Sequence, residues 1–89
     1  MLSATERREL KARAHKLEPM VMIGTKGLTD EVVKEVDVAL KAHELIKVRA
    51  AGLEREERDD TLKELCERTG AESVQSIGKV FVIYRKRDE

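Results

Sequence analysis

Apolar residues recur along this chain at two different spacings, which predicts that helices and strands alternate. Apolar positions three or four residues apart, as on one face of a helix, occur between Ser3 and Pro19, between Thr29 and His43, and over residues 55–69. Continuous or alternating apolar runs, typical of strands, occupy residues 20–23, 45–50, 72–77 and 80–84. The predicted order of elements is therefore α-β-α-β-α-β-β.

Polar residues and glycines mark the predicted ends of these elements. Ser3 is placed to open a capping box and Thr29 to cap the second helix, while Gly70 suits the residue that ends the third helix. Gly78-Lys79 fits a two-residue hairpin loop between the last two strands. Alternating helices and strands favour parallel pairing, and the hairpin adds an antiparallel neighbour. The continuous apolar run Met20–Ile23 is expected to form a buried strand.

The length of 89 residues leaves room for one domain, expected at 1–85, followed by a short charged tail at 86–89. No apolar stretch approaches the roughly 18 residues of a membrane span. A single cysteine, Cys66, cannot form an internal disulfide, which fits a reducing compartment. We therefore expect a cytoplasmic monomer that makes no contact with membranes.

The segment Gly24-Thr25-Lys26-Gly27 lies between a predicted strand and a predicted helix. Glycines tolerate positive φ and carry no side chain, so the main-chain N–H groups of such a turn can approach a phosphate closely. The helix that follows is expected to offer unpaired N–H groups and the positive end of its dipole to the same spot. A GxxG loop of this kind clamps nucleic-acid backbone in KH modules. Two glycines three apart also occur in plain turns, so the motif alone leaves both interpretations open.

Charge is balanced over the whole chain but is distributed unevenly along it. The 18 basic and 18 acidic residues cancel, so the overall basicity typical of nucleic-acid-binding domains is absent. Residues 1–27 nevertheless carry a net charge of +3 and residues 45–53 a net +2, whereas residues 28–44 and 54–69 each carry −3. If the positive segments share one face, a neutral chain can still present a basic patch.

Five further residues are candidates for contact with nucleic acid. On the first predicted helix, Arg8, Lys11 and His15 lie on one face without an acid between them. Lys47 and Arg49 alternate with apolar residues in a predicted strand and point away from its apolar face. Basic stripes are often only solvated surfaces, so neither group identifies a binding site by itself.

Catalysis and metal binding find little support in the sequence. His15, His43 and Cys66 lie on three separate segments, and no CxxC, HxxxH or nucleophile–base spacing occurs. We therefore expect a non-enzyme without cofactors. The only aromatic residues, Phe81 and Tyr84, fall on opposite faces of one predicted strand. Because base stacking needs exposed rings, recognition of RNA backbone and shape is favoured over reading of a single-stranded sequence.

Several short motifs also follow one another in a characteristic order and spacing. They are Leu10-Lys11-Ala12-Arg13-Ala14-His15, Gly24-Thr25-Lys26-Gly27-Leu28-Thr29, His43-Glu44-Leu45-Ile46-Lys47-Val48, Thr69-Gly70-Ala71, Val74-Gln75, Ile77-Gly78-Lys79 and Tyr84-Arg85. In this order they resemble the CRM domain (chloroplast RNA splicing and ribosome maturation), and most closely its stand-alone bacterial form, the YhbY-like proteins. The resemblance implies a two-layer α/β (α+β) domain with a four-stranded mixed sheet, similar to the C-terminal domain of translation initiation factor 3. It also implies RNA binding through the GxxG loop and association with precursors of the large ribosomal subunit.

Two classes of function remain after these observations. The first is an RNA-binding assembly factor of the large ribosomal subunit, which holds pre-ribosomal RNA through residues 24–27, the first helix and the basic strand positions. The second is a protein-interaction module whose acidic second and third helices bind a basic ribosomal partner. The two functions can coexist in one chain, and salt-dependent retention of RNA separates them.

Overall fold

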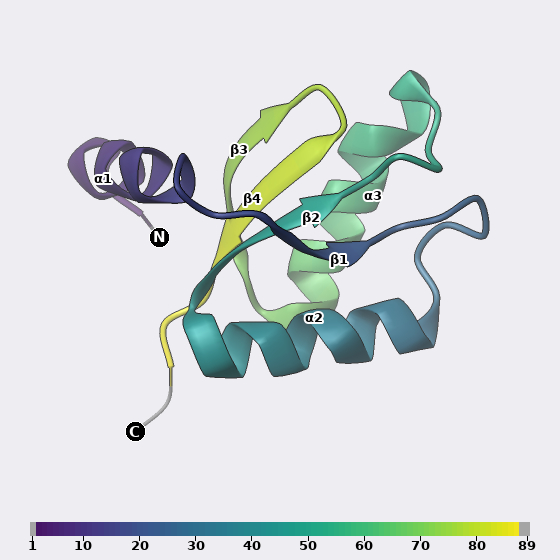
Figure 1. The fold of residues 1–89 in the computed structure, drawn as a ribbon, viewed down its shortest axis with the longest axis horizontal. Coiled ribbons are helices and arrows are strands. Elements are labelled where there is room, and N and C mark those ends of the chain that lie inside the picture. Colours follow the sequence, from purple (N-terminus) through teal and green to yellow (C-terminus); the bar gives the residue numbers. More distant parts are fainter. Residues whose placement is uncertain (1, 88–89) are drawn as a thin grey trace.

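The computed structural model describes residues 2–87 and contains the predicted elements in the predicted order (Figure 1). The elements are α1 (Ala4–Ala14), β1 (Pro19–Met22), α2 (Asp30–His43), β2 (Leu45–Arg49), α3 (Arg55–Thr69), β3 (Glu72–Ile77) and β4 (Val80–Tyr84). Of the predicted tail 86–89, Asp88 and Glu89 lie outside the described residues.

The four strands form one mixed sheet in the order β1-β2-β4-β3. β1 and β2 are parallel and are joined by α2, whereas β4 is antiparallel to both of its neighbours, β2 and β3. The predicted mixture of parallel crossover and closing hairpin is confirmed. Because β4 lies between β2 and β3, the last strand of the chain occupies an interior position in the sheet.

β1 differs from the buried strand that its apolar run predicted. It forms one edge of the sheet, and in it Met20 is 43% and Met22 is 64% exposed. Only Val21, together with Ile23 just beyond the strand, is buried. A continuous apolar run indicates that side chains can be buried on both faces, but it does not say how many neighbours the strand has.

The ends of the elements follow the predicted local chemistry. The hydroxyl of Ser3 accepts a hydrogen bond of 3.1 Å from the main-chain N–H of Glu6, which completes the capping box of α1. The Thr29 hydroxyl accepts one of 3.2 Å from Val32 and caps α2. Gly70 ends α3 with a φ of 72°, the left-handed conformation that glycine adopts without a Cβ penalty.

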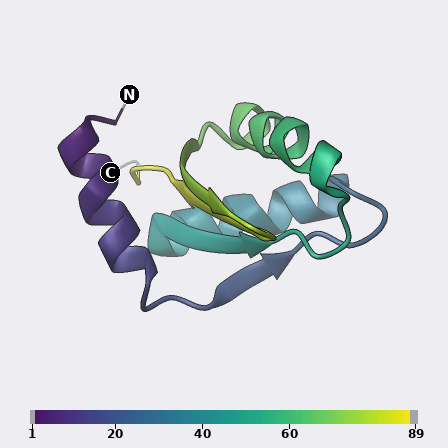
Figure 2. The ribbon, with the colours of Figure 1, turned by 90° about the horizontal axis from the view of Figure 1, so that it is seen from above.

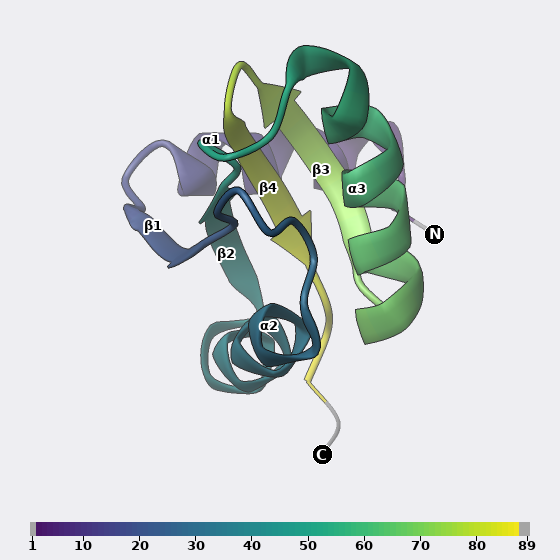
Figure 3. The same ribbon diagram turned by 90° about the vertical axis from the view of Figure 1, so that its right-hand side faces the viewer.

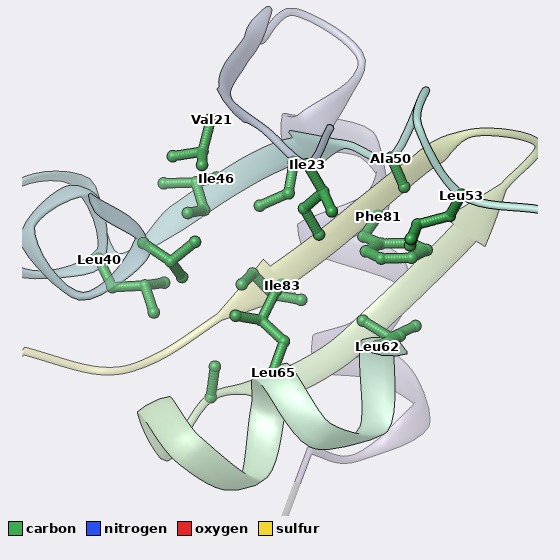
Figure 4. Close-up of a cluster of buried hydrophobic side chains, with 13 residues drawn as sticks. Val21, Ile23, Leu40, Ile46, Ala50, Leu53, Leu62, Leu65, Phe81 and Ile83 are labelled. Carbon is green, nitrogen blue, oxygen red and sulfur yellow. The ribbon is translucent and has the colours of Figure 1, made fainter. Parts of the chain in front are cut away.

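One face of the sheet is covered by α2 and α3, which lie along the same side of the strands (Figure 3). Alternate strand residues, among them Ile46, Val48 and Phe81, have no exposed surface and pack against Leu40 and Leu65 of these helices (Figure 4). Burial of each large apolar side chain contributes about 1.5–3 kcal/mol. These side chains form the main core. The sheet on one side of it and the two helices on the other are the two layers of the expected domain.

The opposite face of the sheet is covered only at one end, by α1. Leu45 and Val82 point away from the main core and pack against Leu10 and Ala14 of α1. α1 stands at the end of the sheet far from the loop that joins β1 to α2 (Figure 2). The rest of this face, towards that loop, is called the open face below.

Candidate nucleic-acid interface

Residues 24–27 form a tight, exposed turn between β1 and α2. The main-chain N–H of Gly27 donates to the carbonyl of Gly24 at 3.0 Å, and Gly27 has a φ of 73°. The main-chain N–H groups of Thr25 and Lys26, at the centre of the turn, find no acceptor among residues 2–87. Such free N–H groups in a turn can receive an anion.

A second loop, between β2 and α3, supports this turn. The N–H of Gly52 donates to the carbonyl of Ile23 at 3.1 Å, and a Cβ on Gly52 would overlap the main chain of Gly24 and Thr25. Glycine is therefore required at position 52 by close approach of two main chains. Sequence reasoning missed this residue, because a lone glycine in a loop gives no sign of the segment that packs on it.

The N-terminus of α2 is partly capped and carries acidic residues, which weakens the anion site expected there. The Thr29 side chain already accepts from one of the free N–H groups, and Asp30 and Glu31 place two carboxylates in the first turn of the helix. Both carboxylates complement the positive end of the helix dipole; Asp30 is also paired with Arg68 at 2.6 Å, so the charge of Glu31 is the main repulsion for a phosphate. The 24–27 turn, with its free N–H groups and no acidic residue, is therefore the better candidate for anion contact at this corner.

Lys47 and Arg49 lie on the open face, as predicted from the alternation in β2. The sheet register places Lys47 opposite Val82, and Arg49 between Met22 of β1 and Val80 of β4. Met22 is two residues before Gly24, so on the β1 side Arg49 lies close to the 24–27 turn. On the β4 side it lies beside the β3–β4 hairpin. The two cations form a row that leads along β2 towards the 24–27 turn.

The first helix reaches the other end of this row. Lys11 and His15 line a groove of about 230 Å³ that lies between α1 and the sheet and also includes Lys47. Arg8 is exposed one turn earlier on the same helix face and does not line the groove. The candidate residues are thus spread from α1 at one end of the sheet to the β1–α2 loop, which contains Lys26, at the other (Figure 1).

Five ion pairs of the described chain involve residues of α2, of α3 and of the segment after β4, and they lie on the covered side of the sheet. They join Lys41 and Arg85 to Asp37, Arg68 to Asp30 and Glu64, and Arg87 to Glu44. Among residues 2–87, no acidic side chain lies within ion-pair distance of Lys11, Lys26, Lys47 or Arg49. Cations without protein partners remain available to phosphate groups.

Neither aromatic residue is placed to stack on an exposed base. Phe81 is fully buried in the main core, and Tyr84 is half-buried in the cluster beneath α1. The two rings lie on opposite faces of β4, as predicted. His15 is therefore the exposed ring nearest to the open face.

Cys66 is the free cysteine of the chain, on α3. Burial raises the pKa of the Cys66 thiol to about 11, with a further contribution from the charge of Glu72. A thiol with so high a pKa is a poor nucleophile at neutral pH. Residues 2–87 contain no cluster of three or more His, Cys, Asp or Glu side chains able to hold a metal ion. Within the same part of the chain, no helix has the length and apolar character needed to cross a membrane.

Comparison with known families gives one match over nearly the whole chain. The model of the CRS1/YhbY (CRM) domain matches residues 2–85. A Haemophilus influenzae protein named RNA-binding protein is 43% identical, over 99% of this chain and 89% of its own length. A probable RNA-binding protein of Pseudomonas aeruginosa is 41% identical, over 96% of this chain and 82% of its own length.

A solved structure has the same fold. The solution structure of a Staphylococcus aureus protein, described as a hypothetical protein and a candidate for RNA binding, superposes with a TM-score of 0.87. The two sequences are 35% identical, and the match covers 100% of this chain and 93% of that protein. The family, its fold and the names of these relatives all point to a binding protein rather than to an enzyme.

Proposed function

The chain belongs to the CRS1/YhbY (CRM) domain family, and we propose that it binds the backbone of structured RNA through the 24–27 turn and the open face of the sheet. The names of its relatives support RNA as the class of ligand. The observation that carries the proposal is the row of unpaired cations, Lys11, Lys47 and Arg49, which leads to a turn with free N–H groups.

The physical reason for backbone recognition is the composition of this surface. Side-chain cations and turn N–H groups bind phosphate oxygens, which are present at every nucleotide. The buried positions of Phe81 and Tyr84 leave no aromatic platform for reading several bases in succession. Affinity should therefore depend strongly on salt and weakly on RNA sequence.

Gly24 allows a direct test of close phosphate approach. A Cβ at Gly24 would meet no atom within 4 Å, so Gly24→Ala should leave the fold unchanged. If a phosphate contacts the turn main chain, that methyl group blocks the approach and RNA affinity falls. We expect a melting temperature like that of the wild type and a weaker isotherm with an RNA hairpin. Full affinity in a folded Gly24→Ala variant would reduce the loop to an ordinary turn.

Lys26 tests the electrostatic part of the same contact. Lys26→Ala should weaken binding of every RNA hairpin and reduce the slope of log affinity against log salt by about one. Lys63→Ala is the matched control, because Lys63 is exposed on α3 on the covered side of the sheet. An unchanged slope for Lys26→Ala would remove this residue from the interface.

We further propose that the RNA is ribosomal and that the protein acts on precursors of the large ribosomal subunit in the cytoplasm. This part of the proposal follows from the resemblance to YhbY-like proteins. Crosslinking in cells followed by sequencing of the bound RNA tests it. Crosslinks concentrated in precursors of large-subunit RNA support the proposal, and crosslinks concentrated in introns or messenger RNA contradict it.

A further inference from the structure

The groove between α1 and the open face combines an apolar floor with a basic rim. Its floor is formed by Val80 and Val82 of β4, with Ile77 of β3 at one side. The volume of about 230 Å³ lies below the roughly 300–1,000 Å³ of pockets for drug-sized molecules. The groove therefore has room for one small ring system.

The charged residues around the groove all have the same sign. Lys11 of α1 and Lys47 of β2 line it, and no Asp or Glu among residues 2–87 does. The apolar floor is unsuitable for a phosphate, because an ion loses its hydration there without a partner. The rim, by contrast, attracts phosphates. A nucleotide satisfies both requirements when its base enters the groove and its phosphates stay at the rim.

Two further side chains suit a base in particular. Gln75 is half-buried, and among residues 2–87 its side-chain amide has no hydrogen-bond partner, so it can offer both a donor and an acceptor to a base edge. His15 is exposed at the groove and presents an imidazole ring, which can stack on a base.

We propose that this groove accepts one unstacked nucleobase of the bound RNA, such as a bulged residue, with His15 stacked on the base and Gln75 bonded to its edge. The inference rests on the proposed RNA binding and adds to it a subsite for a base. Contacts of Lys26 and Arg49 with phosphates would position the RNA, and the groove would favour RNA with an extruded nucleotide over a perfect duplex.

The test uses a set of hairpin RNAs that differ at one position. Each hairpin has the same stem with a single-nucleotide bulge, which carries one of the four bases or an abasic ribose, so the number of phosphates is constant. The wild-type protein should bind at least one base-bearing hairpin roughly 5- to 10-fold more tightly than the abasic hairpin, the lower range for stacking of one base on a side chain.

Variants then locate that preference. His15→Ala should remove most of the preference for the base-bearing hairpin over the abasic hairpin while leaving the salt slope unchanged. Gln75→Met, which keeps the length of the side chain but removes its amide, should reduce the differences among the four bases. The matched control is His43→Ala, because His43 is exposed on α2 and lies outside the groove.

The outcomes separate this inference from the proposed function. Salt-dependent binding with equal affinity for base-bearing and abasic hairpins overturns the base subsite but leaves the proposed RNA binding intact. An apolar side chain of a peptide would then be the better occupant of the groove. A preference that is undiminished in His15→Ala, or that is lost equally in His43→Ala, also overturns the base subsite. Failure to bind any hairpin at low salt overturns the proposed function itself.

Discussion

Both faces of the sheet carry apolar and basic residues, but the contacts that these residues make differ between the two faces. On the covered face, Ile46 and Phe81 are sealed beneath α2 and α3, and cations such as Arg85 are paired with acids. On the open face, Lys47 and Arg49 lie without acidic partners between α1 and the 24–27 turn. The residues that stabilise the fold and the residues proposed to bind RNA thus lie on two sides of one sheet.

This separation makes the proposed binding of RNA compatible with a net charge of zero. Residues 28–44 and 54–69, which include α2 and α3, each carry a net charge of −3 and lie on the covered side. The cations of β2 point to the other side. The field that an approaching phosphate meets depends on which side it approaches, so the net charge of the chain is a poor guide to its partners.

The largest effect should come from the covered face. Leu65→Ala removes a side chain with 0% exposure and should lower the free energy of unfolding by about 2–5 kcal/mol. Ile77→Ala, on the open face, truncates a side chain that is 55% exposed and should change it by no more than about 0.5 kcal/mol. Urea unfolding followed by circular dichroism measures both, and equal losses would contradict the division between the two faces.

The next effect should appear in RNA affinity. Lys11→Glu combined with Arg49→Glu replaces two attractions by repulsions and should weaken hairpin binding roughly 100-fold at moderate salt. The matched control, Lys34→Glu with Lys63→Glu, makes the same change of charge on exposed positions of α2 and α3. Filter binding measures the RNA affinity of both variants. If both lose affinity to a similar extent, only the total charge of the protein matters.

The alternative function, a module that binds a basic protein through its acidic helices, predicts the reverse pattern. Asp60→Lys with Glu67→Lys reverses two exposed acids of α3 that make no ion pair among residues 2–87. Under our account this variant still sediments with ribosomal precursor particles. Release of this variant, with retention of Lys11→Glu/Arg49→Glu, would favour protein binding over RNA binding.

A smaller effect should follow from a methyl group at Gly52. Gly52→Ala forces the β2–α3 loop away from the main chain of Gly24 and Thr25, because its Cβ overlaps both. Overpacking of this kind costs about 1–3 kcal/mol of stability. RNA affinity should fall as well, since the turn is displaced. The same variant with full affinity at a temperature where it is folded would show that the turn needs no support.

The smallest effect should come from the carboxylate that anchors the end of β4. Hydrogen bonds from Arg85, at 2.7 Å, and from Lys41 hold the pKa of Asp37 below its usual value of 3.8. The stabilisation that comes from the ionised Asp37 carboxylate is fully present above pH 3.8. It is lost as the pH falls through the lower pKa that Asp37 has in the folded state. Asp37→Asn should cost about 1 kcal/mol at pH 7, since the pair is partly exposed. The difference should narrow below pH 3.8; a constant difference from pH 7 to pH 2 would contradict this assignment.

The sequence predicted the elements well because their signals are local. Ser3 and Thr29 mark helix starts through hydrogen bonds within one turn, and the alternation in β2 correctly separated Ile46 and Val48 from Lys47. Each of these features depends on residues a few positions apart. Periodicity and capping chemistry are sufficient to find them.

The features that escaped prediction depend on distant segments. β1 lies at the edge because the β3–β4 hairpin joins the sheet on the far side of β2. The side of the sheet that α1 covers likewise does not follow from its apolar stripe. Gly52 is required because Gly24 and Thr25 pass close to it. Likewise Gln75 and Lys11 meet at one groove only after the sheet has formed. Such proximities are products of the tertiary fold.

The central claim is that RNA contacts the open face and not the covered one, and amide chemical shifts of the labelled protein test it most directly. During titration with a bulged hairpin RNA, we predict perturbations at Thr25, Lys26 and Arg49, and at the end of α1, with α3 unaffected. The perturbations should vanish at high salt. Shifts concentrated on α3, with the 24–27 turn unchanged, would contradict the account.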